Sequence, residues 1–331
     1  MKHTANIPLA ALAASFLLAS PVFAALSFSS GYGGAEYYTH TSSDNLHSYD
    51  WGSDGNLYYA TATPSFTSGG FYRFNGTTTS TIAGASGDFS GTSVVAVGSS
   101  IFYNDGNFPV AGIYRHDVGS SGAPVGTGVS HYALGSYGGN LLTTGAAGFG
   151  QPTHINYYAG GDLGSTIDLG VVADTSSPGP LVFDGAGNLF YAPGFGDTSI
   201  YRWSAAEVAA AISSNGVNGL TADGHLWVAY GATSLGIYSG ASSLLVDGNG
   251  DVLVSLTNFS DPSLLVKFDG DGSGDYTTIL ESTDRLGDLR SHEGEIYISN
   301  ANQIFQIVPE PSSLLLSFAA CGALLRIRRR A

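Results

Sequence analysis

Short apolar segments with an alternating pattern recur along the chain, and a glycine-rich turn precedes most of them. In one copy, the turn at residues 184–188 leads into Leu189, Phe190 and Tyr191, and a second alternating segment follows at 199–203. Turns of this kind precede antiparallel strands, so each copy predicts a small meander. Equivalent positions in six copies are Leu57, Ile101, Leu141, Leu189, Val252 and Ile296.

The copies are mostly spaced by roughly 40 to 50 residues, the length of one four-stranded propeller blade. We therefore predict an all-β chain that forms a β-propeller of about six blades, or five to seven, the seventh counting a strand start near Leu226. A closed ring removes the unpaired edges that an open stack of meanders would expose. Residues 26–41 are expected to complete the last blade after Ile307. A β-sandwich or an irregular β-solenoid built from the same hairpins is the alternative.

The longest spacing contains residues 204–213, whose sequence predicts a helix. Ser204 stands at the N-cap position, and Glu207 three positions later completes the pattern of a capping box. The extra length of this repeat is therefore explained by an inserted helix.

The charge of the predicted domain, residues 25–307, is strongly acidic. Of the 26 acidic residues in the chain only Glu310 lies outside it, and its basic residues are Arg73, Arg115, Arg202, Lys267, Arg285 and Arg290. An acidic surface repels phosphate backbones, so nucleic acid is excluded as a partner. The single cysteine, Cys321, lies outside this domain, which therefore has no disulfide and no thiol chemistry.

The first 24 residues have the pattern of a cleavable signal peptide. Lys2 provides a positive start, residues 7–18 are apolar, and cleavage is predicted after Ala24. The apolar run is too short for a membrane-spanning helix. The sequence therefore predicts export.

The best candidate for a metal site is an acidic loop with oxygen-bearing side chains at alternate positions, Asp269, Asp271, Ser273 and Asp275. Such spacing allows a loop to surround calcium. The loop departs from an EF-hand, because Leu280 occupies the twelfth position and Glu281 comes one place late. The alternative is a solvated hairpin turn, and otherwise no cofactor is expected.

The turns that begin with Asp54, Asp184 and Asp247 resemble the strand-entry turns of NHL-type and gluconolactonase-like propellers. In gluconolactonase-like propellers a metal and carboxylates at the ring centre perform hydrolysis. The resemblance covers only the rhythm of the blades, so no catalytic residue is transferred, and turn formation explains the aspartates. The sequence has no H-E-x-x-H, G-x-S-x-G or P-loop motif, and no catalytic residue is predicted.

Six aromatic residues in the repeats, Trp51, Tyr58, Tyr59, Tyr72, Trp203 and Trp227, have two possible roles. Facing outward, they would stack on sugar rings. Facing a neighbouring blade, they would form core. The sequence leaves both roles open.

The last segment, residues 308–331, combines three features in order. Val308, Pro309, Glu310 and Pro311 precede an apolar run at 314–325, and Arg326, Arg328, Arg329 and Arg330 follow it. This order resembles the PEP-CTERM sorting signal, a tail also catalogued as an ice-binding protein C-terminal domain. The resemblance implies a single short transmembrane helix, an arginine cluster that anchors in the cytoplasm, and processing by an exosortase near Pro309–Pro311 in a Gram-negative bacterium.

Together these patterns predict an exported protein with signal peptidase and exosortase as processing enzymes. The tail would anchor it transiently in the inner membrane before it reaches the cell surface or the extracellular matrix. With no catalytic motif, the main hypothesis is a non-enzymatic module that binds exopolysaccharide or other glycans. The alternatives are a secreted propeller hydrolase or lyase with a central metal, and a calcium-dependent adhesin. Three or more carboxylate or histidine side chains converging at one mouth of the ring would favour the enzyme.

Overall fold

The computed structural model describes residues 26–42, 44–63, 68–84, 91–105, 112–120, 125–127, 132–148, 150–238, 240–257 and 262–309. The predicted signal peptidase site at Ala24 lies outside these residues. So do Glu310, Pro311, the apolar run and the arginine cluster of the predicted tail. No helix within the described ranges has the length and apolarity needed to cross a membrane.

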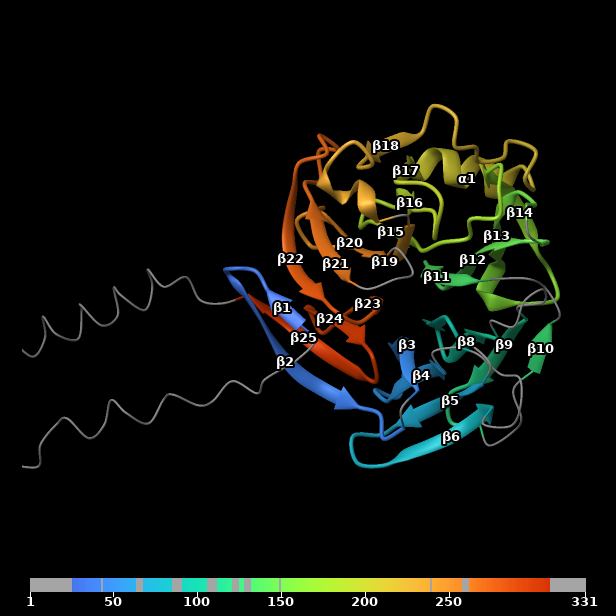
Figure 1. Cartoon of the computed structure of the whole chain (residues 1–331). Coiled ribbons are helices and arrows are strands. Elements are labelled where there is room, and N and C mark those ends of the chain that lie inside the picture. The colour runs from blue at the N-terminus through green and yellow to red at the C-terminus, as the bar shows by residue number, and fades with distance from the viewer. Residues whose placement is uncertain are drawn as a thin grey trace, which may run out of the picture.

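Six antiparallel sheets are arranged as blades around one axis (Figure 1). Blade 1 contains β3 (Asn45–Trp51), β4 (Leu57–Ala62), β5 (Gly69–Phe74) and β6 (Thr79–Gly84). Blade 2 contains β7 (Val94–Val97), β8 (Ser100–Asn104), β9 (Ile113–Asp117) and β10 (Val125–Thr127). Blade 3 contains β11 (Ala133–Tyr137), β12 (Asn140–Ala146), β13 (Thr153–Tyr158) and β14 (Ile167–Ala173).

The remaining three blades complete the ring. Blade 4 contains β15 (Leu181–Phe183), β16 (Leu189–Tyr191), β17 (Ser199–Trp203) and β18 (Leu226–Ala229). Blade 5 contains β19 (Gly240–Val246), β20 (Val252–Thr257), β21 (Ser263–Phe268) and β22 (Tyr276–Ser282), with β1 (Leu26–Phe28) added at its edge. Blade 6 contains β23 (Leu286–His292), β24 (Glu295–Asn300), β25 (Gln303–Pro309) and, from the other end of the chain, β2 (Tyr32–Thr39). The prediction of a six-bladed propeller is confirmed.

The ring is closed by pairing between the two ends of the domain. Strand β2 is antiparallel to β25, from Tyr32 opposite Pro309 to Thr39 opposite Gln303. This confirms that the N-terminal segment completes the last blade. Strand β1 pairs instead with β22 of blade 5, which the sequence pattern did not predict. Strand β25 also extends to Pro309, past the predicted domain boundary at residue 307.

The repeat positions identified in the sequence are equivalent in the structure. Each of the six lies in the second strand of its blade: Leu57, Ile101, Leu141, Leu189, Val252 and Ile296. Leu226 begins β18, the outermost strand of blade 4, and therefore does not start a seventh blade. Helix α1 (Ala205–Ser213) has the predicted capping box between Ser204 and Glu207. Two short 3-10 helices, η2 (Ala159–Gly161) and η3 (Ser234–Ile237), complete the described elements.

The core consists of six apolar clusters, one between each pair of neighbouring blades. Alternate residues of a strand face opposite neighbours, so β4 is buried along its whole length: Leu57 and Tyr59 pack toward blade 6, and Tyr58 and Ala60 toward blade 2. Trp51, Tyr58, Tyr59 and Trp203 are buried, and Tyr72 and Trp227 are partly buried. The six aromatic residues therefore belong mainly to the core and do not form a platform for sugars.

Serines on the inner strands, or directly before them, connect neighbouring blades. The hydroxyl oxygen of Ser48 accepts a hydrogen bond from the Val94 amide (2.7 Å), and Ser93 accepts one from Leu134 (3.0 Å). Ser243 accepts one from the Leu289 amide (2.8 Å) in the same way. Inner-strand amides without a partner in their own sheet are thus satisfied by the blade before them, which fixes the geometry at the centre of the ring.

Candidate functional site

A cavity of about 620 Å³ lies at the centre of the ring, at the mouth where the inner strands begin. All six blades contribute to its lining. His47 belongs to β3, Thr92 and Ser93 precede β7, Tyr132 precedes β11, and Arg285 precedes β23. The segments at 178–181 and 241–244 line it from blades 4 and 5. The size is that of a site for a small molecule.

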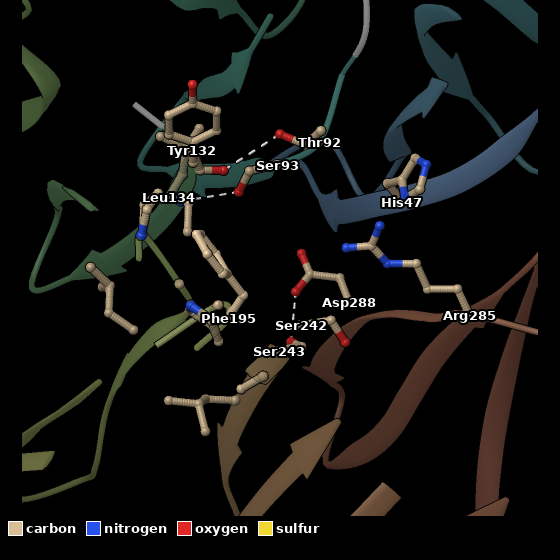
Figure 2. A pocket seen from close by; sticks show the side chains of 18 of the residues that line it. His47, Thr92, Ser93, Tyr132, Leu134, Phe195, Ser242, Ser243, Arg285 and Asp288 are labelled. Atoms are coloured by element: carbon tan, nitrogen blue, oxygen red, sulfur yellow. Dashed lines mark hydrogen bonds between the residues drawn. The ribbon is translucent and has the colours of Figure 1, made fainter. Parts of the chain in front are cut away.

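The lining has two chemically different sides. Figure 2 shows His47, Arg285 and Asp288 on one side, and Tyr132 and Leu134 opposite them. The apolar side is completed by residues of blades 4 and 5, namely Pro178, Pro180, Leu181, Phe195 and Leu244. A ligand in this cavity therefore meets charged groups at one end and hydrocarbon at the other.

Asp288 and Arg290 form a fixed ion pair on the charged side. Arg290 Nη2 lies 2.7 Å from Asp288 Oδ2. The hydroxyls of Ser48 and Ser243 both donate to the Asp288 carboxylate, the second at 2.7 Å. Arg290 also donates to the carbonyl oxygens of Tyr49 (3.0 Å) and Val94 (2.7 Å). The pair thus joins blades 5, 6, 1 and 2, and its charges are already balanced.

Asp50 lies beyond this pair along the axis. Its Oδ2 is 3.9 Å from Arg290 Nε and accepts a hydrogen bond from the Ala96 amide at 2.8 Å. Burial raises the pKa of Asp50, and the Arg290 charge and backbone hydrogen bonds oppose this rise. The side chains of Arg290 and Asp288 are 18% and 12% exposed. Arg290 and Asp288 are therefore fixed groups at the base of the cavity.

His47 and Arg285 form the remaining polar part of the charged side. Burial, and next the charge of Arg285, lower the pKa of His47 to about 3. The imidazole is therefore neutral near pH 7, and it is a weaker base than a free imidazole. Burial also lowers the pKa of Arg285. In Figure 2 its guanidinium points into the cavity beside His47.

The described lining does not fit a central metal. Asp288 is its one carboxylate, and this group is occupied by Arg290 and two serines. Two arginines near the same point would repel a cation. Within the described ranges, no three histidine, cysteine, aspartate or glutamate side chains are grouped as a metal site. The convergence of three or more such groups at one mouth, which would have favoured a metal-dependent enzyme, is therefore not found among the described residues.

The acidic loop lies on the opposite face from the cavity, because it connects β21 to β22, where the inner strands end. Asp269, Asp271, Ser273 and Asp275 are all exposed. The loop is a hydrogen-bonded turn: the Ser273 amide donates to Asp271 Oδ1 (2.9 Å), and the Asp275 amide to Ser273 Oγ (3.2 Å). These contacts agree with the hairpin-turn alternative, and calcium binding stays a prediction.

The aspartates of the strand-entry turns form side-chain-to-backbone hydrogen bonds, as the sequence predicted. Asp184 Oδ1 accepts hydrogen bonds from the amides of Ala186 (2.9 Å) and Asn188 (2.8 Å). Asp247 Oδ1 accepts from the Asn249 amide at 2.8 Å. Gly187 and Gly250, with φ of 86° and 88°, adopt the left-handed conformation that glycine allows.

Sequence patterns did not identify the residues of the cavity. His47 and Arg285 are separated by most of the domain, and the other lining residues come from segments of all six blades. A site of this kind has no local sequence motif. The one available signal was that two of the six basic residues of the domain, Arg285 and Arg290, stand close together in a chain poor in positive charge.

No protein-family model matches the sequence, and no curated protein is similar to it. Solved propeller structures do match the fold. A luciferin-regenerating enzyme has a TM-score of 0.57 at 10% identity, covering 83% of this chain and 95% of its own. A gluconolactonase from Xanthomonas campestris has a TM-score of 0.54 at 13% identity (87% and 94% covered). Virginiamycin B lyase from Staphylococcus aureus has a TM-score of 0.53 at 7% identity (84% and 99% covered).

At these identities the matches show the fold alone. They nevertheless correct the prediction that the chain is not an enzyme, because the propellers it resembles are named as enzymes. That prediction was based on missing motifs, and a site assembled from single residues of six blades leaves no motif. The alternative of a propeller hydrolase or lyase is better supported, without the central metal that was attached to it.

Proposed function

We propose that the chain is a propeller enzyme, a hydrolase or a lyase, whose substrate occupies the central cavity. The observation that carries this proposal is the placement of a neutral imidazole, His47, beside a guanidinium, Arg285, in a cavity of about 620 Å³. A proton acceptor next to a fixed positive charge is the minimum that both reactions require. The enzymes among similar folds support the same class.

The two reactions would use these groups in parallel ways. In hydrolysis, water attacks a carbonyl carbon while His47 accepts its proton, and the protonated imidazole returns that proton to the leaving oxygen. In elimination, His47 accepts a proton from carbon, the C–H electron pair becomes a C=C bond, and the leaving oxygen receives the proton. Arg285 stabilises the oxyanion or the enolate. Neither route needs a further reactant beyond water.

The test is an activity screen of the purified chain against lactones, esters and β-eliminable acidic sugars. Ring opening or ester cleavage is followed by proton release, and elimination by the ultraviolet absorbance of the new double bond. A turnover that falls by about a hundredfold or more in His47→Ala, but not in His154→Ala on an exposed strand position, supports the proposal. A turnover that His47→Ala leaves unchanged would place the chemistry elsewhere and overturn it.

We further propose that the protein is exported and sorted through its tail, as the PEP-CTERM resemblance implies. Strand β25 ends at Pro309, immediately before Glu310, so processing near this motif would release a domain whose ring is already closed by β2. Deleting residues 312–331 should move the protein from the cell surface or matrix to another fraction. An unchanged distribution after fractionation and immunoblotting would contradict sorting by the tail.

A further inference from the structure

Several polar side chains that line the central cavity form their hydrogen bonds within the protein. The Ser243 hydroxyl donates to Asp288 Oδ1 (2.7 Å) and accepts from the Leu289 amide (2.8 Å). The Ser242 hydroxyl donates to the Leu286 carbonyl oxygen at 3.0 Å. A hydroxyl group has one proton to donate, so neither serine has a second proton to offer to a ligand.

Blades 2 and 3 line the cavity in the same way. Ser93 Oγ accepts a hydrogen bond from the Leu134 amide at 3.0 Å. The fully buried side chain of Asn104 accepts from the amides of Thr92 (3.0 Å) and Ser93 (2.7 Å). Its amide nitrogen also donates to the Tyr132 carbonyl oxygen at 3.0 Å. These backbone and side-chain groups are therefore bonded to the protein itself.

The charged groups at the base of the cavity are also engaged. Arg290 Nη2 lies 2.7 Å from Asp288 Oδ2, and Arg290 Nε lies 3.9 Å from Asp50 Oδ2. Arg290 donates in addition to two carbonyl oxygens of blade 1 and of the segment before β7. A ligand with many hydroxyl groups would leave water without replacing its hydrogen bonds at these positions, and each unreplaced bond opposes binding.

The opposite side of the cavity offers hydrocarbon. Leu134, Leu181 and Leu244 line it from three blades. Phe195, in the connection between β16 and β17, lines it as well and is 42% exposed. An aromatic residue with this exposure beside three leucines provides a surface that favours an apolar ligand, because covering it removes hydrocarbon from water.

We infer that the substrate of the central cavity is a molecule with a hydrocarbon body and a single polar group, and not a sugar. This inference rests on the proposed function and names the class of its substrate. The body packs against the apolar side, and the polar group, the one that reacts, lies toward His47 and Arg285. Removal of hydrocarbon from water favours binding without any hydrogen-bond partner. Sugars carry a hydroxyl group on most of their carbon atoms and do not match this lining.

The test measures binding separately from turnover, by calorimetric titration of the full-length chain with probes that contain no ester or lactone. The probes are 4-phenyl-2-butanone, methyl glucoside, which has a similar number of non-hydrogen atoms, and acetone. We expect methyl glucoside to bind about tenfold or more weakly than 4-phenyl-2-butanone, because even one hydroxyl group buried without a partner has this effect. Acetone, which lacks the apolar body, should bind about thirtyfold or more weakly.

Two matched variants locate the apolar contact. Phe195→Ala should weaken the binding of 4-phenyl-2-butanone by about tenfold, because part of the apolar surface is lost. The control is Tyr137→Ala, which should leave the affinity unchanged. Tyr137 is exposed to the same extent as Phe195, but it ends β11 and therefore lies on the face opposite the cavity mouth. Circular dichroism of each variant shows whether it is folded.

The wild-type chain decides the inference without relying on any variant. Methyl glucoside that binds as tightly as 4-phenyl-2-butanone overturns it, and so does the absence of measurable binding of 4-phenyl-2-butanone. A preference for 4-phenyl-2-butanone without turnover of any ester, lactone or acidic sugar supports the inference and contradicts the proposed function. Turnover of sugar substrates that His47→Ala abolishes, together with a preference for methyl glucoside, does the reverse.

Discussion

Replacing Arg290 by methionine is expected to destabilise the ring more than replacing any exposed arginine. The guanidinium contacts Asp288 at 2.7 Å and Asp50 at 3.9 Å, and donates to Tyr49 and Val94 carbonyl oxygens on blades 1 and 2. Methionine keeps much of the apolar stem but leaves two carboxylates without their cation. Removing one partner of a buried ion pair costs about 3–5 kcal/mol, so we expect this loss in the free energy of unfolding.

The pH dependence of the loss distinguishes a charge effect from a packing effect. Arg290 opposes the rise that burial causes in the pKa of Asp50, so without Arg290 this pKa in the folded state lies further above its unfolded value. The folded variant then binds more protons than the unfolded one, so its stability relative to wild type recovers as the pH falls toward that raised value. Each pKa unit of this rise is worth about 1.4 kcal/mol.

The assay is urea unfolding followed by tryptophan fluorescence, with buried Trp203 as one reporter, at about pH 7 and about pH 5. Adding Asp288→Asn to Arg290→Met should restore part of the lost stability, because one uncompensated carboxylate is removed. The control is Arg115→Met, whose exposed pair with Asp117 is expected to contribute at most about 1 kcal/mol. A loss below about 1 kcal/mol that does not change with pH would refute the reasoning.

Three further predictions concern protonation, blade contacts and the helix. The folded pKa of His47 is about 3, below its unfolded value, so the fold should lose stability as the pH falls from about 6.5 toward 3. His47→Gln should reduce the slope of stability against pH by up to about 1.4 kcal/mol per pH unit. Identical pH profiles of the variant and the wild type in urea titrations would contradict this. Ser243→Ala should lower the free energy of unfolding by about 1–3 kcal/mol in the same assay, because the Leu289 amide loses its acceptor and Asp288 loses a donor. The control Ser80→Ala, at an exposed position, should lower it by less than about 0.5 kcal/mol. Equal losses would argue against a role of Ser243 in joining blades. Ser204→Ala should lower the stability of helix α1 by about 1 kcal/mol and speed hydrogen exchange at its first amides. Unchanged exchange at these amides would show that the capping box does not stabilise the helix.

The site was much harder to predict from the sequence than the fold. The glycine turns and alternating apolar residues at Leu57, Leu189 and their equivalents predicted the second strand of every blade, because turn geometry and strand period are local properties. The capping box at Ser204 predicted α1 for the same reason. His47, Arg285 and Asp288 carry no local signal, because the cavity gathers single residues that the ring brings together from distant repeats.

The sequence by itself determined the blade repeat, the closure of the ring by its first residues and the strongly acidic balance of the domain. These features depend on residue type, on the period of the apolar pattern and on total charge, all of which can be read from the sequence. Only the tertiary structure decided that the acidic loop faces away from the central cavity and that two of the few arginines line it. The reason is geometric: when six meanders close into a ring, the starts of their inner strands meet at its centre. The residues that line the cavity therefore come from distant parts of the sequence.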